Sequence, residues 1–167
     1  IAEFIHADPT HILIGNGASE LISIVCRNLI RTIGVPVPTF GEYLHKLKTT
    51  RAVRLYRLRA EKEYCLRLAP YLAWIRQNHL RAALVINPGN PTGQFHPLDE
   101  MREFLTSAQD IDLVIVDESF IDFAGDPVPT LIEFAGEFPN LLVVRSMSKH
   151  CGVPGLRLGY CHSVNKK

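Results

Sequence analysis

The sequence lacks a continuous apolar run of about 18 residues, the length that a membrane-spanning helix requires. Residues 1–4 also lack a basic segment that leads into an apolar one, so they do not resemble a secretory leader. An excess of one charge is missing as well, because 18 Lys and Arg residues stand against 17 Asp and Glu residues, a net charge of +1. A broad attraction to nucleic acid or to an anionic membrane is therefore not expected, and any anion site must be local.

Metal-ligand spacings are absent too. The seven histidines show no such spacing, so no metal is assigned to them. The cysteines include no C-x-x-C, which argues against a zinc site and a disulfide framework. Reduced, mostly buried thiols in a cytoplasmic protein are the simplest interpretation of the four cysteines, Cys26, Cys65, Cys151 and Cys161.

The chain is too short for two full domains, since 167 residues suit one domain with a substantial core. Apolar runs and helical patterns alternate along it, which predicts an α/β fold, a three-layer α-β-α sandwich with a mostly parallel sheet. Helices are expected over residues 18–33, 41–49, 68–78 and 97–108. Strands are expected at residues 11–15, 35–38, 52–58, 82–86, 113–116 and 141–144.

What the sequence does contain is a lysine and an arginine close together after a predicted strand. Lys149 falls at the carboxyl end of that strand, where open α/β sheets bind ligands. A lysine there can form a Schiff base with a carbonyl cofactor, whereas a solvated surface lysine is the ordinary alternative. Arg157 follows in the same loop and offers a planar cation to a phosphate, with Ser146 and Ser148 nearby.

A second candidate anion site lies at the Gly-Asn-Gly turn of residues 15–17. The turn precedes the first long helix, so the backbone N–H groups of Gly17, Ala18 and Ser19 can face an anion. An ordinary strand-to-helix turn is the alternative. A dinucleotide-binding turn is disfavoured, because Glu20 stands where the third glycine of that motif belongs and would repel a pyrophosphate.

Three further side chains are candidates for a ligand site. Asn90 lies in a loop rich in proline and glycine, which can hold its side chain toward a crevice. Asp117 ends an apolar run and is suited to stabilise a protonated heterocyclic nitrogen, although an aspartate there can also cap the next helix. Phe40 can lie against an aromatic ring, although most phenylalanines are core residues.

Taken together, these segments resemble the fold-type I pyridoxal phosphate enzymes, and within them the class I/II aminotransferases close to histidinol-phosphate aminotransferase and threonine-phosphate decarboxylase. The motifs occur in one order over nearly the whole chain. They are GNGASELI at residues 15–22, PTFGEY at 38–43, NPGNPTG at 87–93, VDESFIDF at 116–123 and SMSKHCGVPGLRLGY at 146–160.

The resemblance implies pyridoxal 5′-phosphate as the cofactor and a role for each matching residue. Lys149 would hold the cofactor as an aldimine and then act as the base that moves a proton, and Asp117 would keep the pyridine nitrogen protonated. Asn90 would donate to the phenolic oxygen of the ring, and Phe40 would stack on the ring. The residues around the phosphate would be Gly17, Ala18, Ser19, Ser146, Ser148 and Arg157. No role follows for Tyr43.

The resemblance also implies an aminotransferase that acts on a small amino acid or amino-phosphate as a homodimer, with no nucleic acid or membrane partner. Phe120 departs from the pattern, because aminotransferases of this group commonly carry a tyrosine there, whose hydroxyl also contacts the phenolic oxygen. Threonine-phosphate decarboxylase-like chemistry therefore stays open, as does a cofactor-binding module without catalysis.

The motifs place residues 1–167 in the large cofactor-binding domain, so we expect the family's N-terminal arm and small C-terminal domain to lie outside this sequence. The missing initiator Met agrees with a piece of a larger protein. The stretch 27–38 is shorter than the family pattern, which predicts that a core strand is clipped there.

Overall fold

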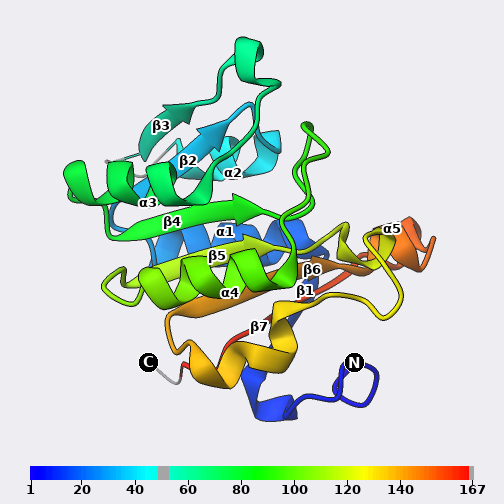
Figure 1. Ribbon diagram of the computed structural model, residues 1–167. Helices are drawn as coiled ribbons and strands as arrows, with labels where there is room; N and C mark the ends of the chain where they lie inside the picture. The colour runs from blue at the N-terminus through cyan, green and yellow to red at the C-terminus, as the bar shows by residue number, and fades with distance from the viewer. Residues whose placement is uncertain (49–52, 166–167) are drawn as a thin grey trace.

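A single twisted sheet forms the centre of the computed structural model, which describes residues 1–48 and 53–165 (Figure 1). The order of its seven strands is β1-β7-β6-β5-β4-β2-β3, and β7 alone runs antiparallel to its neighbours. The strands are β1 (Ile12–Asn16), β2 (Ile33–Val37), β3 (Val53–Arg57), β4 (Ala82–Ile86), β5 (Leu113–Asp117), β6 (Leu141–Ser146) and β7 (Leu158–His162).

Helices cover both faces of this sheet, as Figure 1 shows. The α-helices are α1 (Ala18–Asn28), α2 (Gly41–Leu47), α3 (Leu68–Gln77), α4 (Leu98–Ser107) and α5 (Met147–His150). The 3-10 segments are η1 (Pro9–His11), η2 (Ala60–Lys62), η3 (Ile121–Phe123), η4 (Leu131–Glu137) and η5 (Pro154–Leu156). Residues of α1 and α2 share one core cluster, and residues of α3, α4 and η4 share the other. The predicted three-layer α-β-α sandwich is confirmed.

Side-chain alternation along β5 and β6 divides the core between the two faces. Ile115 and Val144 pack with α1 and α2, whereas Val116 and Val143 pack with α3, α4 and η4. All four are buried, and burying a side chain of this size contributes about 1.5–3 kcal/mol. The strands read as apolar runs because both of their faces are covered.

The expected helix over residues 18–33 is wrong at its C-terminal end. Helix α1 ends at Asn28, and β2 begins at Ile33. Ile33 and Val35 are fully buried in the sheet, and Pro36 has no N–H to donate within a helix. β-Branched residues favour the pleated surface, so the apolar spacing that fitted a helix belongs partly to a strand.

The strand that was expected to be clipped is present, so that prediction is also wrong. β2 pairs in parallel with β3 along its whole length and with β4 at Ile33 and Gly34. A side chain at Gly34 would place its Cβ 2.2 Å from Ile75 Cδ1, so α3 packs directly on this strand. The shorter connection before β2 therefore removes loop and not core.

Several smaller expectations have mixed outcomes. The expected C-terminal end of the helix over residues 41–49, Thr49, and the expected start of the strand over residues 52–58, Ala52, lie outside the described residues. All four cysteines are free, but only Cys26 and Cys161 are buried, so the expectation of mostly buried thiols is wrong for Cys65 and Cys151. Within residues 1–48 and 53–165, every helix is too short or too polar to cross a membrane.

The topology brings five chain segments to one edge of the sheet. The carboxyl ends of β1, β4, β5 and β6 meet there, because these strands are parallel. Strand β7 is antiparallel, so it begins at the same edge: Leu158 pairs with Asn16, and Gly159 pairs with Ser146. Side chains just after four strands and just before the fifth are therefore neighbours.

Candidate active site

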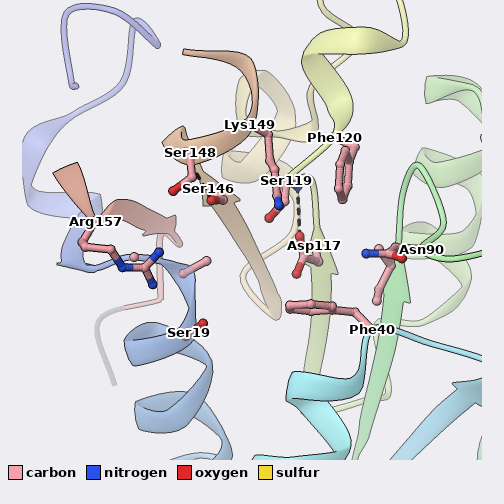
Figure 2. Close-up of a pocket in the computed structure, with 13 residues that line it drawn as sticks. Ser19, Phe40, Asn90, Asp117, Ser119, Phe120, Ser146, Ser148, Lys149 and Arg157 are labelled. Atoms are coloured by element: carbon pink, nitrogen blue, oxygen red, sulfur yellow. Dashed lines mark hydrogen bonds between the residues drawn. The ribbon is translucent and has the colours of Figure 1, made fainter. Parts of the chain in front are cut away.

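A cavity of about 200 Å³ opens at this edge of the sheet (Figure 2). Its walls contain all ten residues that the sequence singles out: Gly17, Ala18, Ser19, Phe40, Asn90, Asp117, Ser146, Ser148, Lys149 and Arg157. Ile86, Ser119 and Phe120 complete the lining. Residues from one end of the chain to the other are thus brought together around one space.

One end of the cavity is suited to an anion. Gly17 has a φ of 72° and precedes α1, which has no side-chain hydrogen bond at its N-cap. The first N–H groups of an uncapped helix and the positive end of its dipole attract anions. The positive φ favours glycine, and a Cβ at Gly17 would lie 2.8 Å from Arg157 Nη2 and displace the guanidinium. Figure 2 shows Arg157 beside Ser19 at this end.

Glu20 shows how the turn is built. Its carboxylate Oε2 accepts a hydrogen bond of 2.7 Å from the backbone N–H of Asn16. The side chain therefore folds back to close the turn between β1 and α1. This contact gives Glu20 a structural role at the position where a dinucleotide-binding turn would carry glycine.

The same end of the cavity depends on close packing at Gly159. This residue is buried between Gly15 of β1 and Ser146 of β6. A Cβ built on it would lie 2.4 Å from the backbone nitrogen of Ala18, a distance that neither backbone can accommodate without moving. Glycine at this position is what lets the first turn of α1 rest against β7.

Replacing Gly159 with alanine should therefore push the first turn of α1 away from the sheet. We expect the free energy of unfolding to fall by about 1–3 kcal/mol, as for other overpacked sites, together with weaker binding of a ligand at this end of the cavity. Gly136→Ala is the matched control, because nothing lies within 4 Å of its added Cβ. Equal stability and equal affinity in the two variants, measured by denaturant unfolding and fluorescence titration, would contradict this packing argument.

Asp117 forms the polar centre at the other end. The carboxyl group is buried, and each oxygen accepts one hydrogen bond, Oδ2 from the Tyr43 hydroxyl at 2.8 Å and Oδ1 from the Ser119 backbone N–H at 2.9 Å. Burial raises the pKa of Asp117, and the hydrogen bonds from Ser119 and Tyr43 oppose that rise. The residue at the N-cap of η3 is Phe120, so Asp117 does not cap the helix that follows.

Tyr43 and Ser119 are the functional neighbours that sequence reasoning missed. Tyr43 is fully buried in α2, and burial raises the pKa of its hydroxyl well above the usual value, with the nearby Asp117 adding to the rise. The hydroxyl therefore stays protonated and remains a donor to the carboxylate. A local signal exists for Ser119, which follows Asp117 by two residues in an Asx-type turn.

Phe40 lies at the rim of the cavity and not in the core. Its side chain is 39% exposed, and its ring meets that of Tyr43 edge to face at a centroid distance of 6.5 Å. In Figure 2 the ring borders the space below Asp117. The core-residue alternative is therefore wrong, and the ring is free to contact a flat ligand.

The loop that carries Asn90 is held by its first residue. Asn87 is buried, donates from Nδ2 to the His96 carbonyl at 2.9 Å and accepts at Oδ1 from the His96 N–H at 2.8 Å. Its own N–H donates to the Asp117 carbonyl at 2.9 Å. Asn87 thus links the loop to β5, which fixes Asn90 on the cavity wall facing Asp117 (Figure 2).

Lys149 reaches the cavity from the short helix α5. The Ser146 hydroxyl accepts from the Ser148 N–H at 3.4 Å at the start of this helix, which sets both serines and the lysine on one turn. The Lys149 amine lies 5.5 Å from the centroid of the Phe120 ring. Figure 2 shows the side chain extended between Ser148 and Phe120 toward the space above Asp117.

The donor set fits pyridoxal phosphate. The anion end offers a guanidinium, two serines and the first turn of a helix. The opposite end offers a buried carboxylate that accepts one hydrogen bond at each oxygen. Between them lie an amine, an amide and an aromatic ring. A phosphorylated heterocyclic aldehyde has matching groups at its two ends.

Known proteins place this arrangement in a family. The model of the family described as aminotransferase class I and II matches residues 1–167. An L-serine phosphate decarboxylase from Campylobacter jejuni is 37% identical over 165 residues, which cover 96% of this chain and 42% of that protein. A histidinol-phosphate aminotransferase from Leuconostoc mesenteroides is 31% identical over 167 residues, or 96% of this chain and 45% of that protein. The chain spans less than half the length of these relatives.

Solved structures agree. A decarboxylase from Sulfurospirillum multivorans has a TM-score of 0.88 at 30% identity, over 97% of this chain and 47% of that chain. A histidinol-phosphate aminotransferase from Sinorhizobium meliloti, solved with pyridoxal-5′-phosphate, shares the fold with a TM-score of 0.83 at 23% identity, over 97% of this chain and 44% of that chain. The chain belongs to the aminotransferase class I and II family, whose members are pyridoxal phosphate dependent.

Proposed function

We propose that this cavity binds pyridoxal 5′-phosphate with its phosphate at α1 and its ring nitrogen at Asp117. Lys149 would bond to the cofactor, Phe40 would lie against the ring and Asn90 would donate to the phenolic oxygen. The residues proposed to surround the phosphate are Gly17, Ala18, Ser19, Ser146, Ser148 and Arg157. The observation that carries this proposal is that the buried carboxylate and the anion-binding turn lie in one cavity with a lysine between them.

The protein groups have distinct tasks in such a site. The bound cofactor supplies an electron sink for a bond broken at the substrate Cα. Asp117 keeps the ring nitrogen protonated, because its two hydrogen bonds hold it in position and favour its ionised form. Lys149 would deliver a proton to Cα once carbon dioxide has left in decarboxylation, or would remove the Cα proton in transamination. Arg157 and the α1 turn anchor the phosphate, so that the ring keeps one orientation.

For the reaction, we propose decarboxylation of a small phosphorylated amino acid as the first candidate. The relatives support it, since an L-serine phosphate decarboxylase from Campylobacter jejuni is 37% identical and a Sulfurospirillum multivorans decarboxylase is the solved structure at TM-score 0.88. Phe120 supports it as well, because this side chain lines the cavity without the hydroxyl that aminotransferases of this group commonly place there.

The second candidate is the aminotransferase reaction that the sequence resemblance implies. Its support is the 31% identity to a histidinol-phosphate aminotransferase from Leuconostoc mesenteroides. The two reactions differ in the bond at Cα that is held perpendicular to the ring, either the bond to carboxylate or the bond to hydrogen. We further propose that residues 1–167 form part of a large cofactor-binding domain that works as a homodimer.

Product analysis distinguishes these candidates. The protein would be loaded with pyridoxal phosphate, reduced with borohydride and mapped by mass spectrometry, with the label expected on Lys149. Unreduced protein would then receive L-serine phosphate or L-threonine phosphate, with and without a keto acid acceptor. Release of carbon dioxide and the matching amine supports decarboxylation, whereas a keto acid product supports transamination. Labelled Lys149 with neither product would leave a cofactor-binding module without catalysis.

A further inference from the structure

A cluster of charged side chains is buried on the face of the sheet that α3, α4 and η4 cover. Arg145 of β6 and Asp122 of η3 form an ion pair at 2.5 Å, with side chains 7% and 10% exposed. Glu118, the residue after β5, is buried beside them and accepts from the Thr130 hydroxyl at 2.6 Å and from the Leu131 N–H at 2.8 Å. We call Glu118, Asp122 and Arg145 the clamp.

Stability alone does not explain these charges. The clamp lies beside a cluster of apolar core residues, and a buried ion pair is often no more stable than apolar residues of the same volume. Burial raises the pKa of Glu118 to about 7, against the hydrogen bonds from Leu131 and Thr130 and the charge of Arg145. The charges of Arg145 and Asp122 neutralise each other, and Glu118 accepts two hydrogen bonds, so each of the three side chains has a partner.

The clamp is joined directly to the cavity by strand alternation. Glu118 follows Asp117, and Arg145 precedes Ser146, so neighbouring residues point to opposite faces of the sheet. The Glu118 N–H also donates to the Val144 carbonyl at 2.8 Å, which extends the pairing of β5 and β6 past the last strand residue. A shift of the clamp therefore moves the strand ends that carry the site.

The turn between β5 and η3 carries the connection further. The Ile121 N–H donates to the Glu118 carbonyl at 3.0 Å, and the Phe123 N–H donates to the Phe120 carbonyl at 3.1 Å. This turn presents the Ser119 N–H to Asp117 Oδ1 and the Phe120 ring to the Lys149 amine. Glu118 holds the start of the turn, and Asp122 holds its end.

We propose that Glu118, Asp122 and Arg145 are positioning residues, which hold the 118–123 turn so that the Ser119 N–H fixes the Asp117 carboxylate. This inference rests on the proposed role of Asp117 toward the ring nitrogen. The clamp touches neither substrate nor cofactor and acts through Ser119 and Phe120.

Two variants test the clamp. Asp122→Asn removes the carboxylate that contacts the buried Arg145 guanidinium and is expected to lower stability. The double variant Arg145→Met with Asp122→Leu replaces the pair by apolar side chains of similar volume and is expected to keep the melting temperature. The control is Arg81→Gln with Asp112→Asn, because that Arg–Asp pair has a similar separation of 2.7 Å but lies exposed on the surface.

The first readout is hydrogen exchange of the Ser119 amide in protein without cofactor. The second is the dissociation constant of pyridoxal phosphate, with the pH titration of the bound cofactor's absorbance. The double variant should exchange faster at Ser119 and bind the cofactor about 10-fold more weakly, which corresponds to about 1.4 kcal/mol. The pH titration of its bound cofactor's absorbance should shift. The control should match the unsubstituted protein in exchange rate, dissociation constant and absorbance titration.

The outcomes separate the clamp from the proposed function. If the folded double variant has the same hydrogen-exchange rate at the Ser119 amide as the unsubstituted protein, the clamp is refuted. This holds whether or not the affinity for the cofactor changes. If exchange rises but affinity and titration stay unchanged, the turn is structural only and the positioning role is refuted. If the unsubstituted protein takes up no pyridoxal phosphate, the proposed function fails, and the exchange measurement still decides whether the clamp holds Ser119.

Discussion

Replacing Lys149 with alanine is expected to abolish covalent attachment of pyridoxal phosphate and to lower turnover by at least about 10⁴-fold. The magnitude follows because the side chain is proposed both to bond to the cofactor and to move a proton, and proton transfer by a positioned group alone contributes about 10²–10⁴-fold. The measurement is mass spectrometry after borohydride reduction, together with product formation. The label expected on Lys149 in the unsubstituted protein should be lost.

Two controls make this result specific. Lys149→Arg keeps a cation near the Phe120 ring, which lies 5.5 Å from the amine, but offers no amine that bonds to an aldehyde. It should therefore lose the label as completely as alanine does. Lys62→Ala, at an exposed position in η2, should keep both label and turnover. A label that moves to another lysine with turnover preserved would remove Lys149 from the proposed mechanism.

The features that the sequence predicted well are those that depend on local order along the chain. Asp117 ends a strand, and Asn90 and Lys149 lie just after strands, and parallel strands bring such residues to one edge of the sheet without further information. The anion-binding turn at Gly17 is equally local, because a glycine before a helix is visible in the sequence. These residues could be grouped before any coordinates were known.

The features that were missed depend on tertiary contacts. Tyr43 and Asp117 are 74 residues apart, and their hydrogen bond exists because α2 packs against the end of β5. Arg145 and Asp122 meet on the face of the sheet that α3, α4 and η4 cover, and the hydrophobic periodicity of the sequence does not indicate that contact. The end of α1 was misjudged because Ile33 fits both a helical and a strand pattern, and the choice is made by its burial between β3 and β4.

Replacing Asp117 with asparagine is expected to separate activity from stability. Asparagine has no negative charge to keep the ring nitrogen protonated, so turnover should fall by about 10²–10³-fold, the usual cost of removing a preorganised electrostatic group. Burial raises the folded-state pKa of Asp117, so ionisation of this group weakens the fold as pH rises from the unfolded-state pKa to the folded-state pKa. The neutral amide removes that penalty.

Tyr43 makes this separation measurable. In Asp117→Asn the amide oxygen can accept from the Ser119 N–H while the amide nitrogen donates to the Tyr43 hydroxyl, so both contacts are kept, but the Tyr43 O–H loses its acceptor. The gain from removing a buried charge opposes the cost of that lost acceptor, so we expect denaturant unfolding at neutral pH to show a stability close to that of the unsubstituted protein, with turnover lost. The control is Asp110→Asn, in an exposed pair with Arg76, which should change neither stability nor turnover. If Asp117→Asn lowers stability and turnover together, Asp117 acts mainly in folding. Retained turnover would instead mean that the ring nitrogen does not depend on this carboxylate.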